Sequence, residues 1–211
     1  MLLFKILLIF LIVFGLTGIC FGLSVLIGIL TNNTKKLKYL NYYSFQLVGL
    51  FLFIVYYFTL SKKPNIFNFG NFDNLWIWPI VILTLTITIL IATVKSETTK
   101  RNTKELWINF TSAALMEIPQ RALTQIILIQ YLNNLRINYC IAIILNALVW
   151  DLGIIVQNAF TKTKIISKKS IVELTSSFIF SLGVGYLFYI TENILFVMAL
   201  HAIHRSVVYF I

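Results

Sequence analysis

The chain has 211 residues, of which 59% are hydrophobic and 11% are charged, and its mean hydropathy is +0.90. About a quarter of the residues in a soluble domain are charged, so this composition excludes an ordinary soluble protein and predicts an all-α polytopic membrane protein. The net charge of +10 would suggest nucleic acid as the partner of a soluble protein, but here the Lys and Arg residues fall in short loops between apolar segments, so we expect the lipid bilayer as partner and no nucleic acid.

Seven apolar segments follow one another and predict about seven transmembrane helices. They run over residues 3–30, 39–60, 75–95, 106–132, 137–157, 171–189 and 193–211. The first is too long for a signal peptide and lacks a small-x-small cleavage site, so we expect it to stay as a membrane anchor. Its Gly15, Gly18 and Gly22 have the small-residue spacing of a close helix–helix contact. Cys20 and Cys140 fall inside predicted spans and indicate neither a disulfide nor a Cys-based metal site.

The loop charges predict how the chain is oriented in the cell membrane. The loops 31–38, 95–105 and 157–170 hold eleven Lys or Arg residues. The alternate loops hold three: Lys62, Lys63 and Arg136. By the positive-inside rule, the three basic loops and the C-terminus are cytoplasmic and the N-terminus is outside.

The fourth apolar segment contains two opposite charges, Glu117 and Arg121, where an unpaired ionisable group costs several kcal/mol or more. Their four-residue spacing places them on one helical face, and Asn109, Thr124 and Gln125 lie on the same stripe. The stripe should therefore face protein or trapped water rather than lipid. Pro119, between the two charges, should kink the helix.

Two further ionisable residues, Asp151 and His201, lie in the fifth and seventh spans. At 1.5 Å of rise per residue, Glu117 is about 18 Å from the cytoplasmic end of its span, His201 about 15 Å and Asp151 about 9 Å. We expect these three residues and Arg121 to line one cavity that opens inward. As a lone acid in a span, Asp151 needs a partner, which Arg121 or Arg205 would supply.

These residues resemble the motifs of a known family. Leu115–Ala122 reads LMEIPQRA and resembles the E-E-x-x-x-R motif of the CAAX protease and bacteriocin-processing (CPBP, or Abi) intramembrane proteins. The closing stretch Gly183–Arg205 is similar to the segment of that family that ends in H-x-x-x-N, and Ala142–Ile154 occupies the place of its F-x-x-x-H segment. The resemblance covers residues 106–211, expected to form a CPBP-like core of about four helices, which follows an N-terminal region of about three, residues 1–105.

The resemblance implies a membrane-embedded endopeptidase, in which Glu and His residues of the motifs activate water and other polar residues stabilise the oxyanion. Glu117 and Arg121 match the second Glu and the Arg of the first motif, and His201 matches the His of the last. These three are the expected catalytic residues, and Asp151 is a weaker fourth. From the residues alone, Glu117 and Arg121 also fit an ion pair that fixes helix packing, and His201 fits an interhelical hydrogen bond.

Three positions depart from the motifs. Met116 replaces the first Glu, which is the expected base, and Arg205 replaces the last Asn. The place of the middle His falls on Asp151 or Ile154, depending on how Trp150 is aligned. A thioether does not accept a proton at neutral pH, so the family mechanism cannot run unchanged.

Three functions fit these patterns. The favoured one is a divergent, catalytically weakened relative that binds a peptide or a membrane-protein partner, in bacteriocin self-immunity or as a scaffold for an envelope enzyme. The second is an active endopeptidase for a peptide, prenylated or leader substrate, in which Glu117, Asp151 and His201 form a rearranged site, with no cofactor or with a divalent metal such as zinc on Glu117 and His201. The third is a small transporter, although the sequence lacks paired broken helices in its two halves.

Overall fold

The computed structural model describes residues 2–31, 38–60, 63–69, 71–94, 102–160 and 167–210. Its helices are α1 (Leu2–Thr31), α2 (Lys38–Thr59), η1 (Asn71–Asp73), α3 (Ile77–Thr93), α4 (Thr103–Glu117), η2 (Ile118–Gln125), α5 (Ile126–Asn134), α6 (Tyr139–Phe160), α7 (Lys168–Thr191) and α8 (Ile194–Phe210). Within the described ranges no strand occurs, and the β-type pairing is one antiparallel bridge between Phe67 and Asn193. The predicted all-α class is confirmed.

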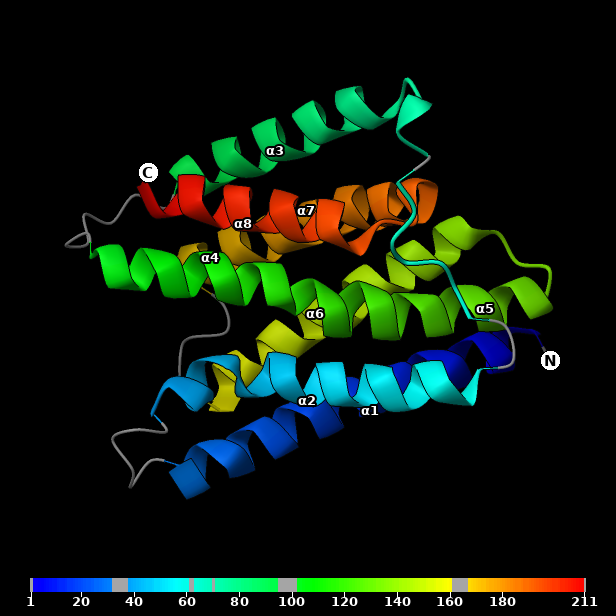
Figure 1. Ribbon diagram of the computed structural model, residues 1–211, viewed down its shortest axis with the longest axis horizontal. Coiled ribbons are helices and arrows are strands. Elements are labelled where there is room, and N and C mark those ends of the chain that lie inside the picture. The colour runs from blue at the N-terminus through cyan, green and yellow to red at the C-terminus, as the bar shows by residue number, and fades with distance from the viewer. Residues whose placement is uncertain are drawn as a thin grey trace.

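Successive long helical segments run in opposite directions and form one bundle (Figure 1). Because α4, η2 and α5 follow one another without a gap, the described residues form seven long helical segments, which coincide closely with the seven predicted ones. Among the described residues, four helices are long and apolar enough to cross a membrane: α1, α2, α6 and α7. The apolar helices α3 and α8 are shorter, at 17 residues each.

The helix ends that adjoin the three basic loops gather at one end of the bundle. The ends of α1, α3, α6 and α8 and the starts of α2, α4 and α7 lie together on the left of Figure 1. Most of the loop cations lie outside the described residues: Lys35, Lys36, Lys95, Lys100, Arg101, Lys162 and Lys164. The N-terminal helix starts at the opposite end, as an odd number of segments requires.

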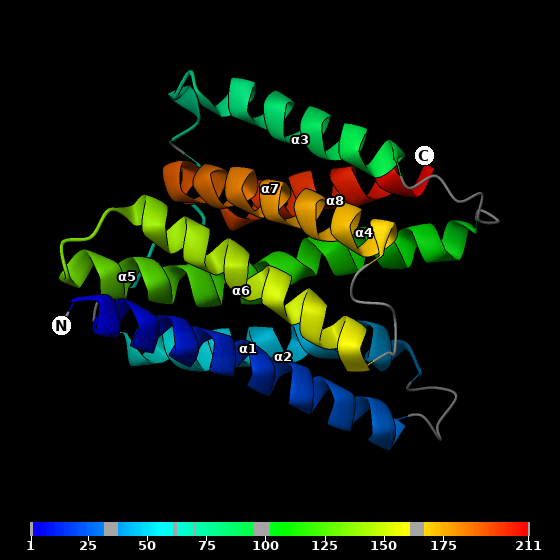
Figure 2. The same ribbon diagram turned by 180° about the vertical axis from the view of Figure 1, so that it is seen from behind.

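The segment α4–η2–α5 joins two apolar cores. One core lies among α3, α7 and α8 and includes Val184, Leu187 and Val197, with Ala122 of η2. The other lies among α1, α5 and α6 and includes Val13, with Leu128 of α5. Figure 2 shows α6 crossing the back of the bundle between α1 and α7, which both contact it. The middle of the chain is therefore the element around which both halves pack.

Pro119 distorts this central segment, as expected. Pro119 has no N–H to donate and its ring crowds the preceding turn, and the backbone adopts an eight-residue π-helix, Ile118–Gln125, in its place. Gly49 of α2 packs directly on the proline ring, because a Cβ at Gly49 would lie 2.4 Å from the Cβ of Pro119. Any larger residue at position 49 would push α2 away from η2.

The glycines of α1 do not make the close contact that their spacing predicts. A Cβ added at Gly15, Gly18 or Gly22 would meet no atom within 4 Å. Their spacing fits a helix interface, but within the described residues α1 packs through its larger side chains, such as Ile9 and Val13. Close approach occurs instead at Gly183 of α7, where an added Cβ would collide with the Thr84 side chain of α3.

Candidate functional site

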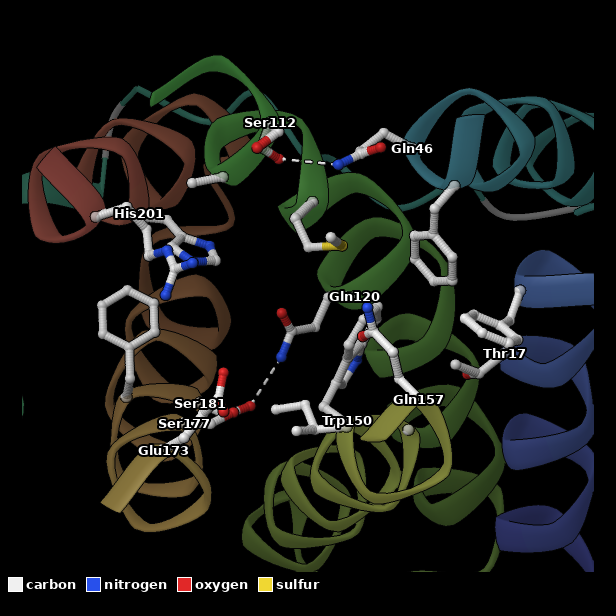
Figure 3. Close-up of a pocket in the computed structure, with 18 of the residues that line it drawn as sticks. Thr17, Gln46, Ser112, Gln120, Trp150, Gln157, Glu173, Ser177, Ser181 and His201 are labelled. Atoms are coloured by element: carbon white, nitrogen blue, oxygen red, sulfur yellow. Dashed lines mark hydrogen bonds between the residues drawn. The ribbon is translucent and has the colours of Figure 1, made fainter. Parts of the chain in front are cut away.

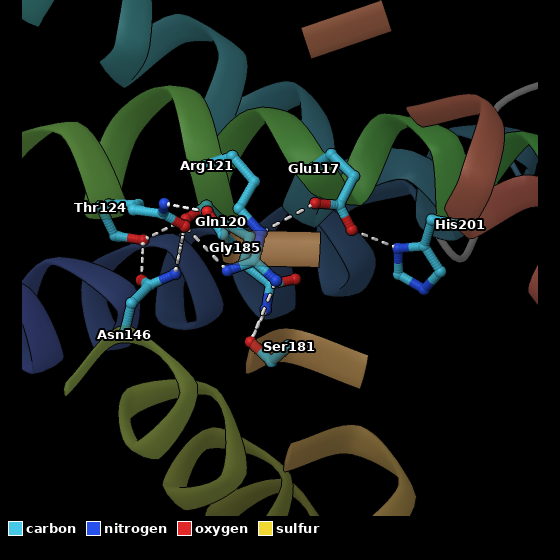
Figure 4. A network of polar contacts seen from close by, with 9 residues as sticks. Glu117, Gln120, Arg121, Thr124, Asn146, Ser181, Gly185 and His201 are labelled. Carbon is cyan, nitrogen blue, oxygen red and sulfur yellow. Dashed lines mark hydrogen bonds and ion pairs between the residues drawn. The ribbon is translucent and has the colours of Figure 1, made fainter. Parts of the chain in front are cut away.

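The π-helix places a run of polar side chains in the interior of the bundle. Every residue from Pro119 to Gln125 is buried. A π-helix is rare and is found most often at functional sites, because the wider turn redirects side chains. Here it gathers Gln120, Arg121, Thr124 and Gln125 toward α6 and α7 (Figure 4).

A fully buried ion pair lies at the start of this run. Arg121 Nε donates to Glu117 Oε2 at 3.0 Å, and neither side chain has any exposed surface. The other two guanidinium nitrogens donate to Gln125 Oε1 and to Ser181 Oγ of α7, each at 3.0 Å. The arginine thus has a hydrogen-bond acceptor for each nitrogen, the condition under which a buried charge is tolerated.

The network continues from the arginine to α6 and α7. Gln125 Nε2 donates to the carbonyl oxygen of Gly185 at 2.7 Å. The hydroxyl of Thr124 is 2.7 Å from Asn146 Oδ1, and Asn146 Nδ2 donates to the carbonyl oxygen of Gln120 at 3.1 Å. Gly185 lies close against this network, since a Cβ there would be 3.1 Å from both Arg121 Nη1 and Gln125 Oε1.

His201 of α8 completes the network on its other side. Its Nδ1 lies 2.5 Å from Glu117 Oε1. Because a carboxylate only accepts, Nδ1 carries the hydrogen and donates it. Both carboxylate oxygens of Glu117 are therefore bonded, one to Arg121 and one to His201. The expected proximity of Glu117, Arg121 and His201 is confirmed.

A cavity of about 520 Å³ lies beside this network (Figure 3). Its wall is formed by the halves of the helices that adjoin the basic loops, with Met116, Gln120, Ser181 and His201 among the lining residues. Glu117 and Arg121 do not line it, and both are completely buried. The expectation that the two charges face the cavity was therefore wrong, because bonds to α7 and α8 hold them behind its wall.

Asp151 lies apart from the other three residues. Neither Arg121 nor Arg205 pairs with it among the described residues; its carboxyl group interacts with Ser177 of α7. Its Oδ1 is buried without a hydrogen-bond partner in the described part of the chain, and it does not line the cavity. Its predicted place in one cluster with Glu117 was wrong, because the guanidinium of Arg121 is directed to Glu117, Gln125 and Ser181, with one hydrogen bond from each nitrogen.

The described residues do not offer a set of metal ligands. Within the ranges that the structure covers, no three His, Cys, Asp or Glu side chains are grouped as a metal site requires. Glu117 and His201 are in contact, but the oxygens of Glu117 face the Arg121 guanidinium and the Nδ1–H of His201. Among the described residues this pair alone falls short of the three protein ligands that structural and catalytic zinc sites use.

Sequence reasoning did not identify three members of the network: Gln120 of the same segment, Asn146 of α6 and Ser181 of α7. Their positions in the sequence mark them only as polar residues in apolar spans. That is the signal by which they could have been found, since a polar side chain inside a span needs a bonded neighbour. Asn109, on the predicted stripe, does not join the network.

No family model, no curated protein and no solved structure matches the chain. The function must therefore be inferred from the geometry of the site itself.

The buried ion pair should be essential for stability. Replacing Arg121 with Met should lower the free energy of unfolding by about 3–5 kcal/mol, because Glu117 keeps a buried charge without its cation. The double variant Glu117→Met/Arg121→Met removes both charges and should regain a large part of that loss. Equilibrium unfolding of the purified protein in mixed micelles with rising SDS measures both variants. A loss below about 0.5 kcal/mol for Arg121→Met, typical of a surface substitution, would contradict the role given to the pair.

Proposed function

We propose that the protein is a multi-pass cell-membrane protein with seven spans, its N-terminus outside and its C-terminus cytoplasmic. Four helices of spanning length, two shorter apolar helices and the continuous segment 103–134 support the count. Large apolar side chains on the outer surface of the helices support a lipid environment, among them Leu3 at 77% and Ile82 at 64% exposure, because soluble proteins rarely expose such surface extensively.

The orientation is tested by labelling single cysteines in a variant without Cys20 and Cys140. A cysteine at Lys164 should react with a membrane-impermeant maleimide only after the cells are opened, because the basic loops are expected on the cytoplasmic side. A cysteine at Asn74, in the loop before α3, should react in intact cells and is the matched control. Labelling of position 164 in intact cells would reverse the proposed orientation.

We further propose that the protein is a CPBP/Abi-like protein that binds a peptide or a membrane-protein partner without cleaving it, as in bacteriocin self-immunity or envelope scaffolding. The proposal rests on the positions of Met116 and Glu117 relative to the cavity. Met116 lines the cavity, whereas Glu117 is fully buried behind its wall with both oxygens bonded. The position at which the family pattern would place a base thus presents a thioether to the cavity.

A general base must reach the proton it removes at about 2.6–3.2 Å, directly or through one water. Glu117 reaches Arg121 and His201 at such distances but has no exposed surface from which to reach a substrate. Its hydrogen bonds connect α4, η2 and α8, which supports a structural role. The cavity, whose lining is part polar and part apolar, supports binding as an activity that needs no base.

An active endopeptidase is the second candidate, favoured by one specific contact. Glu117 accepts the Nδ1–H of His201, and His201 also lines the cavity. A carboxylate that orients an imidazole in this way is a common arrangement for a general base. In this case His201, supported by Glu117, would activate water at the cavity.

Peptide cleavage separates the two candidates. Purified wild-type protein in lipid nanodiscs should leave a library of peptides intact by mass spectrometry, and Glu117→Gln should not change this result. Met116→Glu, which restores the family pattern, is the complementary variant, and it tests whether a cavity-facing carboxylate suffices. Reproducible cleavage by wild-type protein that falls by about 10²–10⁴-fold in His201→Ala or Glu117→Gln, as for loss of a general base, would favour the endopeptidase.

A further inference from the structure

The cavity wall beside the buried network carries hydrogen-bonding groups that the protein itself leaves unused. Gln120 Nε2 donates to Ser181 Oγ at 2.9 Å, but Gln120 Oε1 has no partner among the described residues. His201 uses Nδ1 for Glu117, so in the neutral ring Nε2 is a second acceptor without a protein partner in the described chain. Ser181 Oγ accepts from both Gln120 and Arg121, which leaves its own hydrogen to be donated.

The unused groups could all be satisfied by a ligand that contains amide groups. Two acceptors, on Gln120 and His201, require N–H or O–H donors from a ligand, and the hydroxyl of Ser181 requires an acceptor such as a carbonyl oxygen. All three residues line the same cavity, and Figure 3 shows them around its interior. A peptide backbone supplies donors and acceptors in this combination at every residue.

The charged residues of the lining are confined to one end of the cavity. Glu173 lies near the start of α7 and Arg205 near the end of α8, both toward the end of the bundle that adjoins the basic loops. At 1.5 Å per residue, Glu173 is about 12 Å along α7 from Ser181, and Arg205 about 6 Å along α8 from His201. The interior therefore offers neutral polar groups, and an ionised ligand group placed there would lose hydration without a counter-charge.

The rest of the lining suits an extended chain with small apolar side chains. Hydroxyl and amide residues such as Ser112 and Gln46 line it together with apolar and aromatic ones such as Ile154 and Phe180. The volume of about 520 Å³ lies within the range of cavities that hold drug-sized ligands. A few residues of peptide fill such a space.

We propose that the cavity binds an uncharged peptide segment, whose backbone N–H groups donate to Gln120 and His201 and whose carbonyl accepts from Ser181. This inference rests on the proposed binding function and specifies its ligand class. The segment enters from the end marked by Glu173 and Arg205, where any charged groups of the partner stay hydrated.

Binding can be followed through Trp150, which lines the cavity. In a background in which Trp76, Trp78 and Trp107 are replaced by Phe, Trp150 is the single tryptophan. The full-length protein in nanodiscs is titrated with acetyl-Ala-Gly-Ala-Ala-amide, with the same peptide bearing free charged termini, and with its N-methylated analogue, which lacks backbone donors. The acetylated amide should bind saturably. The N-methylated analogue should bind about five- to tenfold more weakly, because one net hydrogen bond is worth about 1 kcal/mol, and the peptide with charged termini should also bind more weakly, because its ionised groups lose hydration in the cavity.

Two glutamines of the same helical segment form a matched pair of variants. Gln120→Met removes an acceptor from the cavity and should weaken binding about five- to tenfold. Gln130→Met makes the same change at a residue that bonds Tyr56 and does not line the cavity, and it should bind as the parent does. Thermal unfolding in the same nanodiscs identifies a variant that fails to fold, in which case Ser181→Ala is compared with Ser206→Ala of α8 in the same way.

Three results would overturn the inference. The first is no saturable binding of the acetylated amide, the second is equal affinity for the N-methylated analogue, and the third is an equal effect of the two glutamine variants. If the charged peptide alone binds, the ligand class is wrong while the proposed binding function stands. Cleavage of the probe, read by mass spectrometry of the same samples, would contradict the non-cleaving function instead, and dependence on Gln120 would still locate the site.

Discussion

The packing of the helices depends on a buried ion pair in the middle of the bundle. Glu117 and Arg121 have no exposed surface, and an unpaired charge in such a place costs several kcal/mol. The neighbouring helices therefore supply what the pair needs: His201 from α8 bonds the carboxylate, and Ser181 from α7 bonds the guanidinium. The helices approach closely beside the network, as at Gly185, where an added Cβ would lie 3.1 Å from Arg121 Nη1. The helices must therefore pack in a way that also completes the hydrogen-bond network.

The same arrangement separates the charges from the cavity. Met116 is apolar and lines the cavity, whereas the carboxylate of Glu117, the next residue, faces the protein. A one-residue step along a helix turns a side chain by about 100°, which is enough to move the acid from the cavity to the core. Position 116 therefore presents a thioether to the cavity, while Glu117 bonds Arg121 of η2 and His201 of α8.

The sequence predicts the helical segments well, because long apolar runs and short polar loops are strong local signals. It also predicts the contact of Glu117 with Arg121, since a four-residue spacing fixes neighbours on one helix. It does not predict which residues of other helices complete the network, because partners such as Ser181 depend on helix rotation and on the π-helix after Glu117. Asp151 was misplaced for the same reason: depth along a span is readable from sequence, but the direction that a side chain faces within the bundle is not.

Glu117 links α8 to the central segment α4–η2–α5 through its hydrogen bonds to His201 and Arg121. Arg121 and His201 do not bond each other, but each bonds a different oxygen of Glu117. The most direct measurement is a double-mutant cycle on unfolding free energy with Arg121→Met, His201→Ala and the double variant. The account predicts that the double variant departs from the sum of the single losses by about 1 kcal/mol or more, as for residues in one network. Additivity within about 0.3–0.5 kcal/mol would show that the two contacts are independent and would contradict the claim.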